Sequence, residues 1–151
     1  MKQLILALLF FPLSLHARLQ GKALLDSLLH EASLNKKQDT ARVVLLKEIS
    51  FEYASIKPDE GLKYGTDALK LAEQLGWKTG QISAFNSLFV NYFAKADYSS
   101  ALVYGTRGLE ISEKIGDKKH ISTFLGNIAM IYTNEGDYTK SLELQDRKSV
   151  V

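Results

Sequence analysis

The sequence predicts an all-α fold, a solenoid of helix-turn-helix repeats with a period of about 40 residues. The main observation is that part of the chain is written twice. Tyr64-Gly65-Thr66 returns as Tyr104-Gly105-Thr106, and Gly76 returns as Gly116, always at an offset of 40 residues. A fixed period in this range is the signature of stacked-repeat architectures. The second observation is that the apolar residues of most segments follow the three- and four-residue spacing of amphipathic helices.

The composition is that of one soluble globular domain. The chain has 151 residues, of which 46% are hydrophobic and 24% are charged. The formal net charge is +2, with basic and acidic residues interleaved, so no basic stripe favours nucleic acid as a partner. Because the chain has no cysteine, it has no disulfide framework, no thiolate nucleophile and no cysteine-based zinc site.

The first 17 residues have the pattern of a secretory signal peptide. Lys2 supplies the positive charge, residues 4–11 are uniformly apolar, and Pro12 precedes a possible cleavage site after Ala17. The apolar run is too short to span a bilayer, which needs about 20 residues. We therefore expect export to the periplasm or another extracytoplasmic location. The alternative is that this segment is a buried N-terminal helix.

Residues 18–38 are predicted to form a leading helix and a loop ahead of the repeats. One side of a helix at 23–32 carries the apolar residues Leu24, Leu25, Leu28 and Leu29. The polar segment 35–39 is expected to be a loop, with Asp39 or Thr40 as the N-cap of the next helix.

The repeat domain is predicted at residues 39–145, in units 39–77, 78–117 and an incomplete 118–145. In the first unit, a helix at 41–55 is followed by Pro58, which favours the first turn of a second helix. The second helices of the first two units should end with the apolar residues Leu75 and Ile115, each followed by a glycine that stops the helix. No unit could bury its apolar face alone, so the units must stack.

The residue types within each unit resemble the tetratricopeptide repeat (TPR), in its long-period variety found in the N-terminal regions of bacterial sensors and regulators. The third unit matches that pattern best, with Ile128-Ala129, Tyr132, Gly136, Tyr138 and Ser141. The second unit departs from it by placing the bulky Phe89 where a small residue is expected. The first unit has Lys57-Pro58-Asp59 in place of the Gly-x-Tyr turn. The resemblance implies a TPR-like solenoid.

Residues 146–151 are predicted to be a non-native tail. The sequence Asp-Arg-Lys-Ser-Val-Val matches the translation of a common sequencing adapter, and it falls where the last helix of the repeat should continue. We expect the helical pattern to stop there and the natural protein to be longer. A genuine short tail is the alternative.

No constellation of residues indicates catalysis, so we do not expect an enzyme, a metal site or a cofactor. The three histidines, His16, His30 and His120, are not spaced as metal ligands, and phosphate-binding glycine loops are absent. Gly105 and Gly108 fall within a predicted helix, where small residues permit close helix packing.

The resemblance also implies a binding surface, because the first helix of each TPR pair lines the concave face. The residues carried over to that face are Lys47, Phe51, Asn86, Val90, Phe93, Met130 and Asn134. Aromatic, amide and methionine side chains would suit a peptide or an amphipathic segment. The alternative is that Phe51, Val90 and Phe93 only pack against a neighbouring repeat.

The function that the resemblance implies is a non-catalytic module for protein or peptide partners. With the signal peptide, it suggests the extracytoplasmic sensory part of a truncated signalling protein, whose parent resembles a histidine kinase or a transcription regulator. Such a parent would reach the membrane only through a missing C-terminal segment. A free-standing exported TPR adaptor is the alternative. Because the last repeat lacks a cap, we also expect self-association through Leu142 and its neighbours.

Overall fold

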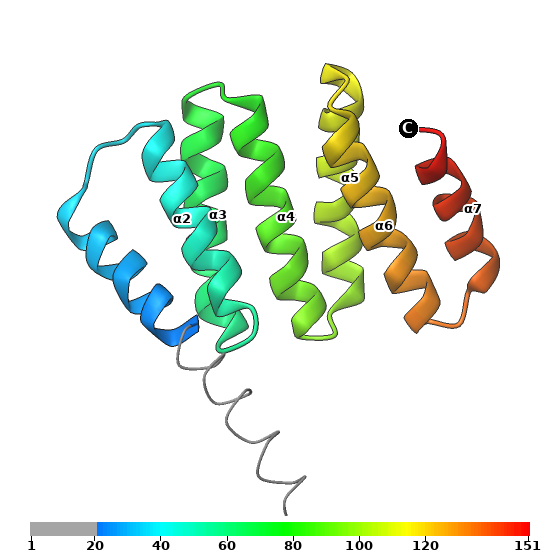
Figure 1. Ribbon diagram of the computed structural model, residues 1–151, viewed down its shortest axis with the longest axis horizontal. Coiled ribbons are helices and arrows are strands. Elements are labelled where there is room, and N and C mark those ends of the chain that lie inside the picture. The colour runs from blue at the N-terminus through cyan, green and yellow to red at the C-terminus, as the bar shows by residue number, and fades with distance from the viewer. Residues whose placement is uncertain (1–20) are drawn as a thin grey trace, which may run out of the picture.

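The computed structural model describes residues 21–151, and the signal peptide predicted at residues 1–17 lies outside them. Within the described chain every regular element is a helix (Figure 1). The elements are a helical segment at residues 21–34, α2 (Thr40–Tyr53), α3 (Pro58–Gln74), α4 (Lys78–Ala94), α5 (Tyr98–Ile115), α6 (Lys118–Asn134) and α7 (Tyr138–Ser149). The predicted all-α class and helix-pair repeat are confirmed, with boundaries shifted by a few residues.

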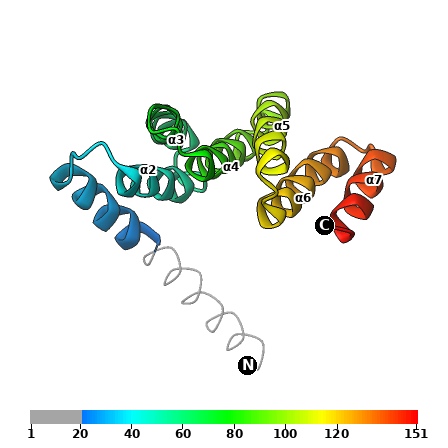
Figure 2. The same cartoon turned by 90° about the horizontal axis from the view of Figure 1, so that it is seen from above.

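The helices form a row of antiparallel pairs, α2 with α3, α4 with α5 and α6 with α7. Each helix packs against the next one in the chain, and α2 also packs directly on α4. Seen from above, α3 and α5 lie on one side of the row and α2, α4 and α6 lie on the other (Figure 2). The first helices of the three pairs therefore share one face of the molecule.

Local sequence signals set the ends of these helices. Gly76, Gly116 and Gly136 follow helices with φ of 63°, 70° and 82°, a left-handed conformation that glycine adopts without strain. Asp39 accepts a hydrogen bond from the backbone N–H of Arg42 and thereby caps α2, as predicted. Ala96 takes the same left-handed conformation at the turn where the third repeat has Gly136.

The leading helical segment is part of the stack. Leu25 is buried against Leu45 and Ile49 of α2. The guanidinium of Arg42 donates hydrogen bonds to the carbonyl oxygens of Ala32 at 2.6 Å and Asn35 at 2.8 Å. A cation at this position satisfies carbonyls that a helix C-terminus leaves free.

Three leucine and isoleucine positions expected in the apolar stripes are exposed. Leu24 is 49% exposed, whereas its neighbour Leu25 is buried against α2. Leu75 and Ile115 lie at the last helical turn before a left-handed glycine, beyond the point where the next helix covers them. Helical spacing alone predicted these positions as buried, and for Leu75 and Ile115 the ends of the helices explain the difference.

The predicted role of Gly105 and Gly108 in close packing is confirmed. A Cβ at Gly108 would lie 2.2 Å from Cζ of Phe124 on α6, and a Cβ at Gly105 would lie 3.0 Å from Cδ2 of Phe89 on α4. Real Cβ atoms do not approach other atoms at the shorter distance, so α5 needs a glycine at position 108 to pack on α6.

The seam between α2 and α4, which we call the first seam, is closed by a buried amide. Nδ2 of Asn91 donates to the carbonyl oxygen of Ser50 at 2.9 Å, to Oγ of Ser50 at 3.1 Å and to the carbonyl oxygen of Ser87 at 2.8 Å. Asn91 is fully buried, and its Oδ1 has no hydrogen-bond partner. That oxygen lies against Gly61 of α3, where a Cβ would be only 1.9 Å away.

The seam between α4 and α6, the second seam, is built differently. Phe89 and Ile131 occupy the places that Ser50 and Asn91 hold one repeat earlier, and both are buried together in one apolar cluster. Two large side chains replace a small one and an amide. As a result, α4 and α6 touch only weakly, whereas α2 and α4 pack closely.

The helical pattern does not stop at residue 146, contrary to expectation. Helix α7 runs through to Ser149, and Leu144 and Val151 pack against the main core. Asp146, Arg147 and Lys148 are compatible with a helix, and basic residues near a helix C-terminus are favourable. Whether residues 146–151 belong to the natural protein stays a prediction.

The surroundings of Gly61 and Gly126 predict opposite effects for two glycine-to-alanine substitutions. Gly61→Ala should destabilise the fold by about 1–3 kcal/mol, because the new methyl group meets the fixed side chain of Asn91. Gly126→Ala is the matched control: its Cβ meets only the flexible end of Lys148, so helix propensity should stabilise it by up to about 1 kcal/mol. Urea unfolding measures both, and a Gly61→Ala variant as stable as the parent would contradict this packing.

Candidate functional site

The predicted binding residues belong to α2, α4 and α6, the helices that share one side of the row. Phe51, Val90 and Met130 hold the same position in the three repeats. Each lies two residues before the tyrosine of the TPR-like pattern. Phe51 is 45% exposed, Met130 is 42% exposed, and Val90 is half-buried. We call these three residues the apolar row, because they place apolar side chains on each helix of the face in turn.

At the α2 end of this face, charge and apolar surface alternate. Lys47 forms an ion pair with Glu48, and Phe51 follows one turn later. Val44, one turn before Lys47, is also exposed. The sequence prediction did not include Val44, although its spacing of three and seven residues from Lys47 and Phe51 places it on the same side of α2.

Phe93 and Asn134 are connected through a residue that the prediction missed. The ring centroid of Phe93 lies 5.5 Å from that of Tyr98 and 6.1 Å from that of Phe89. Nδ2 of Asn134 donates to the hydroxyl oxygen of Tyr98 at 3.3 Å. Phe93 therefore packs within an aromatic group at the turn between α4 and α5, while Asn134 is held beside that group.

Asn86 lies at the second seam and bonds to another residue that the prediction missed. Nδ2 of Asn127 on α6 donates to Oδ1 of Asn86 on α4 at 2.9 Å. Both side chains are half-buried. We call Asn86 and Asn127 the amide pair. No sequence spacing indicates this contact, since the two residues are 41 positions apart and not at equivalent places in their repeats.

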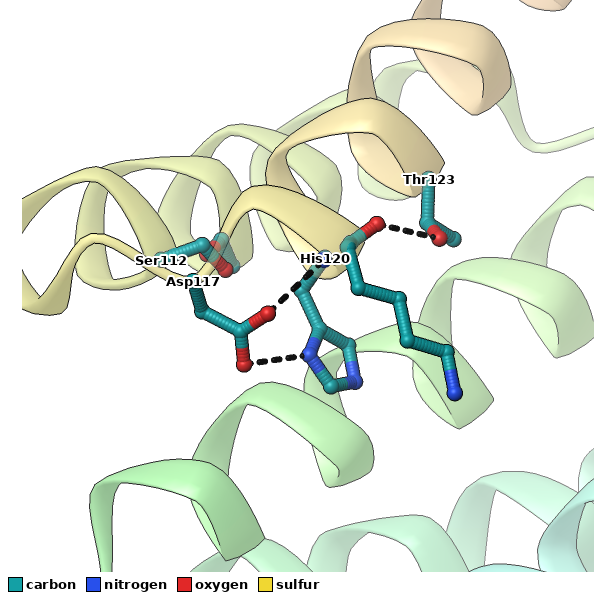
Figure 3. A network of polar contacts seen from close by, with 6 residues as sticks. Ser112, Asp117, His120 and Thr123 are labelled. Carbon is teal, nitrogen blue, oxygen red and sulfur yellow. Dashed lines mark hydrogen bonds and ion pairs between the residues drawn. The ribbon is translucent and has the colours of Figure 1, made fainter. Parts of the chain in front are cut away.

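The polar network around His120 is structural (Figure 3). Oδ1 of Asp117 accepts a hydrogen bond from the backbone N–H of His120 at 3.1 Å. Oδ2 of Asp117 lies 2.7 Å from Nδ1 of the His120 ring. These two hydrogen bonds lower the pKa of the Asp117 carboxyl below its ordinary value of 3.8. Asp117 is the N-cap of α6, so the pair fixes the start of that helix.

Across residues 21–151 no cluster of three histidine, aspartate or glutamate side chains is arranged to hold a metal ion. Nor is any helix in this part of the chain long and apolar enough to cross a membrane. An open pocket of about 600 Å³ lies between α6 and α7, lined by Gly126, Ala129, Met130, Thr133, Gln145, Lys148 and Ser149. This pocket borders the apolar row at Met130.

Comparison with a solved structure supports the architecture. The chain is similar to the crystal structure of the TPR domain of Arabidopsis FLU, with a TM-score of 0.67 and 22% sequence identity over 73% of this chain and 93% of that domain. The chain has the TPR fold. No known family's sequence profile matches it, and no curated protein matches it in sequence. The TPR fold places the first helix of each pair together on one side, as α2, α4 and α6 are placed here.

The Asp117 cap predicts a pH-dependent contribution to the stability of this TPR stack. Because the folded pKa is lower than the unfolded one, ionised Asp117 stabilises the fold above about pH 4, and this contribution is lost as the pH falls through the folded pKa. Asp117→Asn keeps a capping side chain but has no charge. Its free energy of unfolding should therefore be lower than that of the parent by a constant amount near neutral pH, and this difference should shrink in acid. Asp117→Ala should lose about 1 kcal/mol through the missing cap.

Chemical denaturation at a series of pH values measures this difference, with Glu110→Gln on the exposed side of α5 as the control. If the difference in free energy of unfolding between the parent and Asp117→Asn stayed the same below pH 3, the charge of Asp117 would not be the stabilising feature of this cap.

Proposed function

We propose that this domain is a protein-interaction module that binds a segment of a partner protein on the face of α2, α4 and α6. The observation that carries the proposal is the apolar row, in which Phe51 and Met130 stay exposed on a face shared by three stacked repeats. Stacked repeats commonly use such extended faces for binding. The TPR fold itself is typical of non-catalytic interaction modules.

The chemistry of the face favours a partner with apolar anchors. Full burial of a Phe or Met side chain contributes about 1.5–3 kcal/mol, so covering Phe51 and Met130 would supply a useful part of a binding free energy. Aromatic residues and methionine are enriched at protein interfaces, and polar neighbours such as Lys47 and Asn134 would form the rim.

We also propose that the module works outside the cytoplasm as the sensory part of a longer signalling protein. The signal-peptide pattern at residues 1–17 supports export, and the adapter-like residues 146–151 support a longer parent. The second candidate is a free-standing exported adaptor. Reading the source DNA past the codon for Gln145 distinguishes them. A frame that continues into a spanning helix and an output domain favours the sensor, and a stop codon after Val151 favours the adaptor.

Self-association through α7 is a further part of this proposal. Leu142 is 61% exposed and Tyr138 is 70% exposed, whereas Leu102 and Tyr98, their equivalents one repeat earlier, pack against the core. Sedimentation velocity should therefore show concentration-dependent dimers for the parent chain and fewer for Leu142→Lys. A parent chain that stays monomeric at high concentration would rule this contact out.

The binding face can be tested with peptides selected from a random phage-displayed library against the domain. Phe51→Asp and Met130→Asp should each weaken the selected peptides by about tenfold or more, equal to about 1.4 kcal/mol, because they place charge in an apolar contact. Val103→Asp is the matched control, since Val103 is 56% exposed but belongs to α5 on the other side of the row.

Fluorescence anisotropy measures the affinities, and circular dichroism verifies that each variant remains folded. Selected peptides that tolerate both apolar-row substitutions but lose affinity in Val103→Asp would place the interaction surface elsewhere.

A further inference from the structure

A second open pocket, of about 310 Å³, lies where α2 begins and α3 ends, and the proposed interaction does not use it. Arg42 of α2 lines this pocket and lies nine residues before Phe51, a separation of two and a half helical turns. The pocket is therefore on the opposite side of α2 from the apolar row. Its lining includes Gln38, Arg42, Leu46, Asp67, Lys70 and Gln74.

The first repeat lacks two large side chains that the second repeat has at this place. In the second repeat, the guanidinium carbon of Arg107 lies 4.8 Å from the ring centroid of Phe85. The first repeat has Asp67 and Leu46 at the equivalent positions, and the third repeat has an arginine, Arg147, where the first has Asp67. The smaller side chains leave room between α2 and α3, and Asp67 reverses the sign of one charge there.

Arg42 is held in place before any ligand arrives. Its Nη1 donates to the carbonyl oxygens of Ala32 at 2.6 Å and Asn35 at 2.8 Å. A guanidinium has five N–H donors, so those on Nη2 and Nε are not used by these bonds. A side chain that is already fixed loses little further entropy on binding. The planar guanidinium suits a carboxylate, which it can bind through two parallel hydrogen bonds.

Asp67 and Lys70 add one anion and a second cation to the pocket. Within residues 21–151, neither of them nor Arg42 forms an ion pair with another side chain. Two cations and one anion give the lining a net charge of +1. A ligand with two carboxylates and one ammonium group matches all three charges, whereas a ligand with carboxylates alone is repelled by Asp67.

We propose that this pocket binds a free acidic amino acid such as glutamate. The two carboxylates of the ligand pair with the guanidinium of Arg42 and the ammonium of Lys70, and its ammonium group pairs with the carboxylate of Asp67. The inference does not depend on the proposed partner face. Because the pocket is open to water, where charged pairs are weak, we expect affinity in the millimolar range.

Nuclear magnetic resonance titration of the isotope-labelled protein tests the proposal. L-glutamate should shift the backbone amide signals around Arg42 and Lys70, whereas sodium chloride at the same ionic strength should not. Glutarate lacks the ammonium group, and L-glutamine lacks one carboxylate. Each of these two ligands should bind about fivefold more weakly than glutamate, because one charged pair is missing.

Variants of the lining residues identify the pairs. Lys70→Gln should weaken glutamate about fivefold, and Asp67→Asn should remove the preference for glutamate over glutarate. Asp67→Arg should abolish the shifts, because it restores the arginine of the other repeats and repels the ammonium group. Lys63→Gln is the matched control: Lys63 is exposed on α3 two turns before Lys70 and pairs with Glu60 outside the pocket.

Glutarate that binds at least as tightly as glutamate would show a simple anion site and overturn the proposal. Equal losses in Lys70→Gln and Lys63→Gln would also overturn it, as would signals around Arg42 and Lys70 that do not move with glutamate. These variants replace exposed side chains, and circular dichroism verifies that each remains folded.

Discussion

The arrangement of this stack depends on how closely the first helices of neighbouring pairs approach one another. At the first seam a fully buried asparagine, Asn91, bonds to the backbone and hydroxyl of Ser50 and leaves its own oxygen against the bare Cα of Gly61. A buried polar group without its partners costs about 1–3 kcal/mol. Asn91 therefore tolerates one register of α2 against α4 and penalises the others, at the expense of one unpartnered oxygen.

The second seam follows from exchanging that chemistry for apolar volume. Phe89 and Ile131 fill the space between α4 and α6 without any directional bond, and the two helices stay further apart. Phe89 is also the residue that departs from the small side chain expected by the TPR pattern. It also leaves Asn86 and Asn127 bonded to each other near the surface, in contrast to the closed first seam. One pair of substitutions between repeats thus shapes both the core and the candidate binding face.

Much of the fold could be predicted because its signals are local or periodic. The 40-residue offset revealed the repeats, Gly76 and Gly116 marked helix ends, and Asp39 marked a helix start. The buried role of Asn91 could not be predicted, since a polar residue in a helix gives no indication of the partner that will satisfy it. The prediction that the last helix stops at residue 146 was wrong, because the residue types of the tail do not oppose a helix.

For the candidate site, the sequence predicted residues but not the contacts that those residues make. The resemblance implied seven residues on one face, and these residues belong to helices α2, α4 and α6. Their role in binding stays a prediction. Val44, Tyr98 and Asn127 were missed because their contributions depend on which side chains meet across helices. Phe93 shows the reverse: its place on the face was predicted, but its contacts are aromatic packing.

The most direct test of the binding face is methyl nuclear magnetic resonance on the domain with a selected peptide. The account predicts that the methyl signals of Met130 and Val90 shift on titration, while those of Val103 on α5 do not. Shifts at Val103 with Met130 and Val90 unchanged would show that the partner binds the opposite side and would contradict the account.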